Sequence, residues 1–392
     1  MSILFKHIQQ LLQVRPNEEK LVRGQAMAEL PLLENAYLLV ENGRIASFGQ
    51  MEDCPDGGFD QEIDARGRLL LPSWCDSHTH LVYAGNRIQE FEWRLQGRSY
   101  AEIAEAGGGI LNSAKKLQVC SEEDLYQQSQ ARLETLLKLG TGAIEIKSGY
   151  GLSMEAELKM LRVIRRLSQT YNLPVRSTLL ACHALPQEFK GRKEEYVTQV
   201  IDELLPRATE ENLVDFVDIF CEKGYFDLLD TQRMMEAGNQ LGLPAKIHVN
   251  QFHALGGVEV AVQLGALSVD HLEVLNDADL QALRGGETMP VALPACSFFL
   301  DLPYTPARKI IEAGLPLALA SDFNPGSAPT GNMNWVVATA SVKMGLTPAE
   351  AINAATLNGA YAMGLVDEVG SIAVGKRANL LLTKPLPNYA AL

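Results

Sequence analysis

The chain has 392 residues, 47% of them hydrophobic and 21% charged, which is typical of a globular protein and not of a disordered or fibrous one. Its net charge of −14 argues against a nucleic acid or an anionic membrane as a partner. The six cysteines form no Cys-x-x-Cys pair, the first residues show no secretory signal, and no apolar run approaches the ~20 residues of a membrane helix. We therefore expect a cytoplasmic protein without disulfides.

Both ends of the chain carry short strand-like segments. Those at the start are joined by turn residues such as Asn42-Gly43 and lie at 2–8, 36–49 and 62–72. Residues 370–383 have the same character. Because the two termini of a domain often lie close together, we expect one small β-sandwich with residues 1–70 as its N-terminal part and 366–392 as its C-terminal part.

Between these ends, apolar runs alternate with amphipathic helical stretches such as residues 154–171, each long enough to connect two parallel strands. Eight such runs can be counted, at 74–80, 142–148, 176–183, 215–221, 245–250, 267–272, 289–294 and 316–322. Eight strand-and-helix units predict an α/β fold, a (β/α)8 TIM barrel, over residues 71–365. The first connection is about 60 residues long, so we expect part of it to lie over the mouth of the barrel.

The first of these runs contains the sequence His-Thr-His. Residues two apart on a strand face the same side, so His78 and His80 could both reach one ion inside the barrel. This pattern alone is weak evidence, because a pair of hydrogen-bonded core histidines would look the same.

The other histidines strengthen the case for a metal site. His183 ends the third run, His248 lies in the fifth, His271 in the sixth, and Asp322 ends the eighth. Active sites of TIM barrels form at the C-terminal ends of the strands, where these side chains would meet. Three imidazoles and one carboxylate suit Zn²⁺ or iron and leave a position open for water.

With these positions, the chain resembles the metal-dependent amidohydrolases. The resemblance becomes closer in the loops, where the motifs are similar to those of the imidazolonepropionase family: HTHLVYAGNR, SYAEIAEAGGGI, EIKSGYGL, CHALPQEFKGR, DIFCEKGYF and ALASDFNPGSAPTGNM. It covers nearly the whole chain and implies hydrolytic opening of the ring of 4-imidazolone-5-propanoate to N-formimidoyl-L-glutamate by a metal-activated water. It also implies a homodimer.

The resemblance implies one Zn²⁺ or Fe³⁺ per chain. The carboxylated lysine that bridges two metals in some amidohydrolases has no counterpart on the fourth strand, since Lys223 lies past its end. The ligands expected are His78, His80, His248 and Asp322.

Three residues are expected to take part in the reaction itself. Asp322 is the best candidate to take the proton of the attacking water and pass it to the leaving nitrogen. His271 is expected to donate a hydrogen bond to the developing oxyanion or to the water, with a purely orienting role as the alternative. Family members carry glutamate or glutamine at position 251; Gln251 can bind the ring but cannot act as a base.

The propanoate of the substrate requires a cation, and Arg87 offers a planar guanidinium suited to a carboxylate. The resemblance also implies contacts from Tyr150 and His183. Further substrate contacts are expected from Gln251, just after the fifth strand, and from Asn324, Gly326 and Ser327 in the loop after the eighth strand, whose side chains and backbone amides could bind carboxylate groups. A surface salt bridge of Arg87 and a packed Tyr150 are the structural alternatives.

Three other functions remain to be weighed. Another mononuclear amidohydrolase, acting as a cyclic amide hydrolase or deaminase on a different ring, is the nearest, although a deaminase of an uncharged base would not need Arg87. A non-catalytic relative is expected to lose ligands, and none is lost here. A site that only stores metal is usually closed by four ligands without a surrounding funnel.

Overall fold

The computed structural model describes residues 1–98, 102 and 108–392. Most of the SYAEIAEAGGGI motif lies outside the described residues. The described part of the chain contains no helix that is long and apolar enough to cross a membrane.

Eight parallel strands form the larger sheet, in the spatial order of the sequence. They are β6 (Trp74–Thr79), β7 (Thr141–Lys147), β8 (Val175–Cys182), β9 (Phe216–Cys221), β10 (Ala245–Val249), β11 (Ser268–His271), β12 (Met289–Ala292) and β13 (Ala318–Leu319). A parallel bridge between Thr79 and Phe323 joins the first strand to the segment after the last. The amide of Asp322 also donates to the carbonyl of His78 at 2.9 Å. The eight strands therefore form a nearly closed barrel, and the predicted (β/α)8 fold is confirmed.

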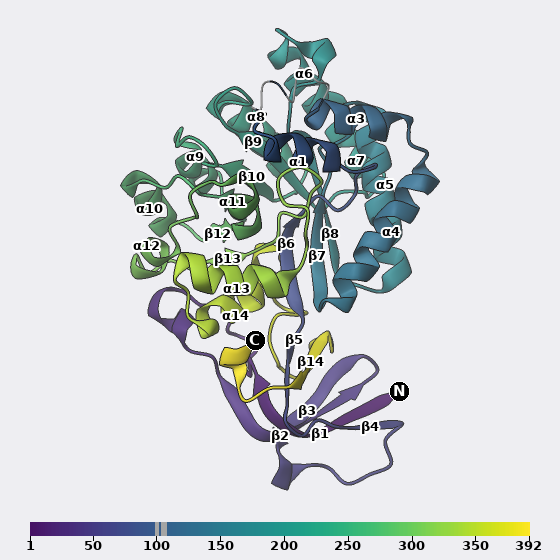
Figure 1. Ribbon diagram of the computed structural model, residues 1–392, viewed down its shortest axis with the longest axis vertical. Helices are drawn as coiled ribbons and strands as arrows, with labels where there is room; N and C mark the ends of the chain where they lie inside the picture. The colour runs from purple at the N-terminus through teal and green to yellow at the C-terminus, as the bar shows by residue number, and fades with distance from the viewer. Residues whose placement is uncertain (99–101, 103–107) are drawn as a thin grey trace.

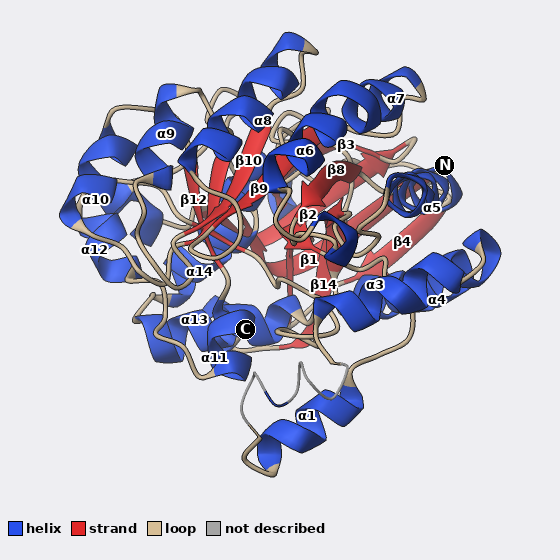
Figure 2. Cartoon of the chain, turned by 90° about the horizontal axis from the view of Figure 1, so that it is seen from above, coloured by secondary structure: helices blue, strands red, loops and turns tan. Residues whose placement is uncertain are grey.

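Helices surround this barrel, as Figure 2 shows from above. The helices are α1 (Ile88–Leu95), α3 (Ile110–Val119), α4 (Glu122–Lys138), α5 (Met154–Tyr171), α6 (Lys193–Gln199), α7 (Leu205–Glu210), α8 (Leu228–Gln240), α9 (Gly257–Gln263), α10 (Asp277–Arg284), α11 (Pro294–Leu300), α12 (Ala307–Glu312), α13 (Met333–Met344), α14 (Pro348–Ala355) and α15 (Leu357–Ala362). Several begin with a residue that satisfies free backbone amides: Asp227 before α8 and Asn276 before α10 each complete a capping box.

The positions of the apolar residues explain why the helices pack around the barrel strands. In α5, the buried positions include Met160, Ile164 and Leu167, which recur at helical spacing on one face, and this helix packs against β8. All residues of β6, β7 and β10 are buried, as expected for parallel strands covered by helices outside and packed side chains inside.

A second sheet lies at one end of the molecule (Figure 1) and contains strands from both chain ends. Its strands are β1 (Ser2–Leu12), β2 (Leu32–Glu41), β3 (Arg44–Gln50), β4 (Gln61–Asp64), β5 (Arg68–Pro72) and β14 (Leu380–Pro385). The C-terminal β14 pairs antiparallel with β5, with Leu382 opposite Leu70. The described residues thus form a separate β-sheet domain from both ends of the chain, as the sequence predicts.

The two sheets are directly connected. Strand β5 ends at Pro72 and β6 begins at Trp74, so the small sheet continues into the strand that carries His78. The amide of Ser73 donates to the carbonyl of Asn379 at 2.9 Å, which ties this junction to the C-terminal strand.

Candidate functional site

The four expected metal ligands meet at the C-terminal end of the barrel strands. The Nε2 atoms of His78 and His80 each lie 3.6 Å from Oδ1 of Asp322. The Nε2 atom of His248 lies 3.4 Å from that of His80. All four side chains are buried. The Nε2 atoms of His78 and His80 therefore lie close to one carboxylate oxygen of Asp322, with Nε2 of His248 close to that of His80.

The donor atoms fit a metal ion. Nε2 of His78 is buried and has no hydrogen-bond partner, although its Nδ1 lies 2.6 Å from Oδ2 of Asp270. Burial, assisted by the neighbouring imidazoles, holds the pKa values of His78 and His80 well below the usual range, so both rings are neutral and keep a lone pair. A buried, unpaired imidazole nitrogen facing a carboxylate is the environment that Zn²⁺ or iron would complete.

Carboxylates behind the histidines orient two of the rings. Asp270 contacts Nδ1 of His78, and Oδ2 of Asp218 lies 2.9 Å from Nδ1 of His248. The hydrogen bond to Asp270 fixes the tautomer of His78 with Nε2 available and raises its basicity, whereas Nδ1 of His248 lies close to Asp218 without a hydrogen bond of good geometry. Sequence reasoning missed both aspartates, although acidic residues in the wholly buried strands β9 and β11 were a signal that could have revealed them.

Two further histidines lie close to the same point. Candidate ligand atoms of His271 lie within 4.8 Å of those of His78 and His248, and those of His183 within 4.8 Å of those of His80 and His248. The His183 ring stacks on His80 with centroids 5.1 Å apart. Burial lowers the pKa of His183 to about 3. The structure thus brings together all five histidines singled out in the sequence.

His271 differs from the others in its electrostatics. Burial alone would lower its pKa, but Oε1 of Glu273, which lies 3.3 Å from Nδ1, raises it above the usual value. His271 and Asp322 both have positive φ angles, 90° and 54°, which are uncommon for residues other than glycine. Such backbone strain is concentrated at functional sites, where the surrounding structure maintains it.

Asp322 and Gln251 both lie beside the buried thiol of Cys296. Burial raises the pKa of Asp322 above its ordinary value, an effect opposed by His271 and His248. The amide Nε2 of Gln251 donates to Sγ of the buried Cys296 at 3.3 Å. Gln251 therefore lies at the pocket with one of its amide hydrogens already engaged by sulfur.

Ten residues line a small inner pocket of about 40 Å³: His80, Tyr150, His183, Phe220, His248, Gln251, His271, Asp322, Asn324 and Ser327. It shares Tyr150, His183, Gln251 and others with a wider cavity of about 480 Å³ that leads outward. Burial raises the pKa of the Tyr150 phenol, so it stays protonated and able to donate.

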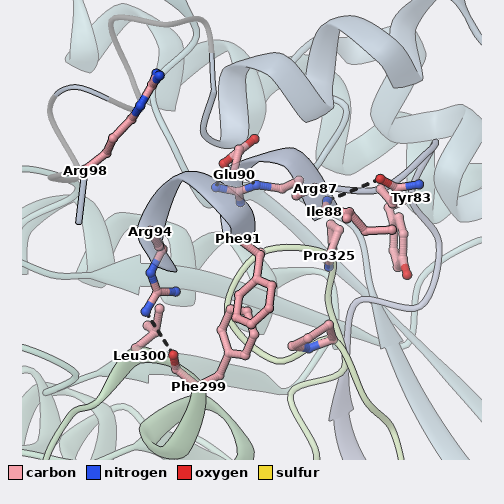
Figure 3. A pocket seen from close by; sticks show the side chains of 13 residues that line it. Tyr83, Arg87, Ile88, Glu90, Phe91, Arg94, Arg98, Phe299, Leu300 and Pro325 are labelled. Carbon is pink, nitrogen blue, oxygen red and sulfur yellow. Dashed lines mark hydrogen bonds and ion pairs between the residues drawn. The ribbon is translucent and has the colours of Figure 1, made fainter. Parts of the chain in front are cut away.

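Arg87 lies at the entrance. Its Nε and Nη2 atoms donate to Oε2 of Glu90 at 2.8 and 2.5 Å, and the Glu90 side chain is almost completely buried. Figure 3 shows Arg87 beside Glu90 on the wall of an outer cavity, with Arg94 donating to the carbonyl of Phe299. Arg87 also lines the wider cavity that reaches Tyr150. The structure therefore places Arg87 by the pocket, held by an acidic partner that the sequence analysis did not identify.

The loop after β13 holds Asn324, Gly326 and Ser327. The backbone amides of Gly326 and Ser327 both donate to Oδ1 of Asn324, at 2.8 and 2.7 Å. Nδ2 of Asn324 donates to the carbonyl of Asp322 at 2.6 Å. The backbone amides of Gly326 and Ser327, two of the expected substrate contacts, are thus used within the loop, and Asn324 shapes the segment that follows Asp322.

Comparison with known proteins places this site in a family. A model described as "Amidohydrolase family" matches residues 223–392. Imidazolonepropionase from Flavobacterium johnsoniae is 58% identical over 389 residues, covering 99% of this chain and 95% of that protein. Imidazolonepropionase from Geobacillus kaustophilus is 42% identical over 370 residues, covering 93% and 87%.

Solved structures agree with the fold at much lower identity. E. coli guanine deaminase superposes with a TM-score of 0.73 at 16% identity, covering 98% of this chain and 89% of that one. A 5-methylcytosine deaminase from Klebsiella pneumoniae gives a TM-score of 0.70 at 18% identity, covering 95% and 90%. On the evidence of the full-length relatives, the chain belongs to the imidazolonepropionase family of the amidohydrolases.

Proposed function

We propose that this chain hydrolyses 4-imidazolone-5-propanoate to N-formimidoyl-L-glutamate. The proposal rests on two features of the cavity formed by the inner pocket and the wider cavity outside it. Imidazole nitrogens converge on Asp322 at its base, and Arg87 lies at its mouth. A small ring with an acidic side chain requires both.

The proposed ligands are His78, His80, His248 and Asp322, holding one Zn²⁺ or Fe³⁺. The ion supplies a Lewis acid that activates water at neutral pH. His271 is left out of the ligand set because its pKa is raised above the ordinary value while those of His78 and His80 are lowered, so that its ring favours the protonated, donating form.

Asp322 and His271 have different roles in the proposed reaction. Water adds its oxygen to the ring carbonyl carbon, the bond from that carbon to the ring nitrogen breaks, and the nitrogen receives a proton. Asp322, with its raised pKa, accepts the proton of the water and returns it to the leaving nitrogen. His271 donates to the oxygen on which charge develops.

The remaining residues bind and orient the substrate. Arg87 contacts the propanoate, with Glu90 fixing the plane of its guanidinium. Tyr150 and His183 contact the ring from the wall of the inner pocket. Gln251 binds the ring through its amide but cannot take a proton, because a carboxamide does not titrate near neutral pH.

The test is a spectrophotometric assay of the loss of freshly prepared 4-imidazolone-5-propanoate, together with metal analysis of the same sample. Turnover with about one ion per chain supports the proposal. Protein that carries metal but does not consume the substrate contradicts it and favours the second candidate.

The second candidate is a deaminase or a cyclic amide hydrolase acting on a different carboxylate-bearing ring. It is favoured only by the shared barrel of the solved deaminases, which are less than 20% identical. A deaminase releases ammonia and a cyclic amide hydrolase does not, so an ammonia assay across a set of cyclic substrates separates the two.

The homodimer and the cytoplasmic location are also proposals. The homodimer is supported by the family resemblance, and the location by six unpaired cysteines. Size-exclusion chromatography with light scattering tests the first, and fractionation of the cells tests the second.

A further inference from the structure

Beneath the histidines lies a cluster of charged residues that the proposed reaction does not use. Its members come from four strands of the barrel and are all almost completely buried: Glu145 and Lys147 on β7, Asp218 on β9, Lys246 on β10 and Asp270 on β11. Burying charges is costly unless each is paired and hydrogen-bonded. Three carboxylates and two ammonium groups in the barrel interior therefore require an explanation.

Lys147 is the centre of this cluster. Its Nζ lies 2.6 Å from Oε1 of Glu145, 2.8 Å from Oδ2 of Asp218 and 3.6 Å from Oδ2 of Asp270. The two aspartates are the carboxylates that contact His248 and His78. One ammonium group thus lies between the orienting partners of two proposed metal ligands.

The two aspartates are held in the same way. In Asp218, Oδ1 accepts from the backbone amides of Ile219 and His248, while Oδ2 is shared between Lys147 and the Nδ1 of His248 at 2.9 Å. In Asp270, Oδ1 accepts from the Ser268 hydroxyl at 2.6 Å.

The second oxygen of Asp270 repeats the pattern. Its Oδ2 is shared between Lys147 and the Nδ1 of His78, which lies 2.6 Å away. In each aspartate, one oxygen is fixed by a local donor and the other faces both the lysine and an imidazole.

We propose that Lys147 is a positioning residue that couples His78 and His248 through Asp270 and Asp218. The ammonium group lies 2.8 and 3.6 Å from one oxygen of each carboxylate, so its charge offsets the repulsion between them. Each carboxylate then holds its imidazole with Nε2 directed toward the metal position. The inference rests on the ligand set in the proposed function.

Lys246 provides a matched comparison. It is as deeply buried as Lys147, and its Nζ is paired with Glu145 and donates to the carbonyl of Ser77 at 3.1 Å. Among the described residues, its Nζ forms no ion pair or hydrogen bond with Asp218 or Asp270. Replacing either lysine removes one buried cation, but only the loss of Lys147 uncouples the two histidines.

The experiment compares Lys147→Met, Lys246→Met and the unaltered chain by Zn²⁺ affinity, measured by chelator competition. Thermal unfolding of each metal-free form reports the effect on the fold alone. Loss of an orienting partner typically weakens metal binding by roughly 10- to 100-fold, so Lys147→Met should fall in that range. Lys246→Met should bind Zn²⁺ like the unaltered chain, even if its metal-free form is equally destabilised.

Two results would overturn the inference. One is an unchanged affinity in Lys147→Met, and the other is an equal loss in Lys246→Met, which would show a general effect of removing a buried charge. His248→Ala separates this failure from that of the proposed site. If His248→Ala itself binds Zn²⁺ normally, the ligand set is wrong.

A second measurement applies if Lys147→Met does not fold. Asp218→Asn and Asp270→Asn are then measured singly and together. Coupling through Lys147 predicts a combined loss of affinity that differs from the product of the two single losses. A combined loss equal to that product overturns the inference.

Discussion

Gly326 and Arg87 approach so closely that a Cβ atom on Gly326 would lie 2.0 Å from Nη1 of Arg87. No real Cβ contact is this short, so any side chain at position 326 must displace the guanidinium. Glycine here allows the loop after β13 to lie against the arginine that faces the pocket.

We therefore expect Gly326→Ala to impair substrate binding without affecting the metal. Displacing Arg87 from the pocket should raise KM, while metal content stays at the level of the unaltered chain. Gly58→Ala is the control, because a Cβ there would have no atom within 4 Å. Unchanged KM in Gly326→Ala would contradict the assigned position of Arg87.

Removing the arginine itself should have a larger effect. Arg87→Ala should raise KM by roughly 10- to 100-fold, the scale of a lost hydrogen bond to a charged group. Arg87→Lys should recover only part of this loss, since an ammonium cannot form the two-pronged contact. Steady-state kinetics and metal analysis on each variant provide the measurement, and normal kinetics in Arg87→Ala would remove it from the site.

Asp322→Asn should abolish turnover. A carboxamide cannot accept the proton of the water and is a weaker ligand than a carboxylate, so both rate and metal retention should fall. Metal content after dialysis and single-turnover rates separate the two effects. An active variant with a full complement of metal would exclude both roles.

His271→Gln should separate catalysis from metal binding. If His271 only donates to the developing oxyanion, the variant should keep its metal and lose roughly 10²- to 10³-fold in kcat. A loss of metal instead would assign His271 to the ligand set, which its proximity to His78 and His248 permits. The check is metal analysis followed by kcat on the loaded protein.

The stability of the chain should increase with pH above about 8 because of Lys376. Burial lowers the pKa of Lys376 to about 8. Between this value and the ordinary lysine pKa, the folded chain holds the amine neutral while the unfolded chain is protonated. The unfolded state then binds one more proton, so the free energy of unfolding rises with pH, by at most ~1.4 kcal/mol per unit.

Lys376→Met lacks this titration. Its stability relative to the unaltered chain should therefore decline between about pH 8 and about pH 10, although it also loses the hydrogen bond to Val366. Urea unfolding of both proteins at several pH values provides the comparison. Parallel pH profiles would contradict the lowered pKa.

Much of the barrel could be predicted because its signals are local. Apolar runs and turn residues placed the first seven strands close to their observed ends, from Trp74–Thr79 to Met289–Ala292. The eighth strand is shorter than expected, only Ala318–Leu319, because the chain leaves the sheet before the left-handed Asp322. The positive φ of Asp322 depends on tertiary contacts, so the local sequence pattern does not predict it.

The candidate site was predictable only in part. Histidines are rare in this chain, so their gathering at the strand ends was visible from spacing alone. The partners of the site residues were not visible: Asp218, Asp270 and Glu90 are ordinary acidic residues until the fold brings them to a ring or a guanidinium. Which carboxylate meets which cation depends on barrel closure and not on sequence separation.

The closure of the barrel has a consequence for the order of folding. Asp76 and Ser321, on the first strand and after the last, are hydrogen-bonded although 245 residues separate them. His78 and Asp322 lie across this same seam. Bringing residues so far apart in the sequence together costs conformational entropy, and this cost comes before the stabilising contacts across the seam have formed. An ion bound across the seam would act as a cross-link between the first and last strands, so we expect metal-free protein to exchange its amide hydrogens fastest along β6 and β13.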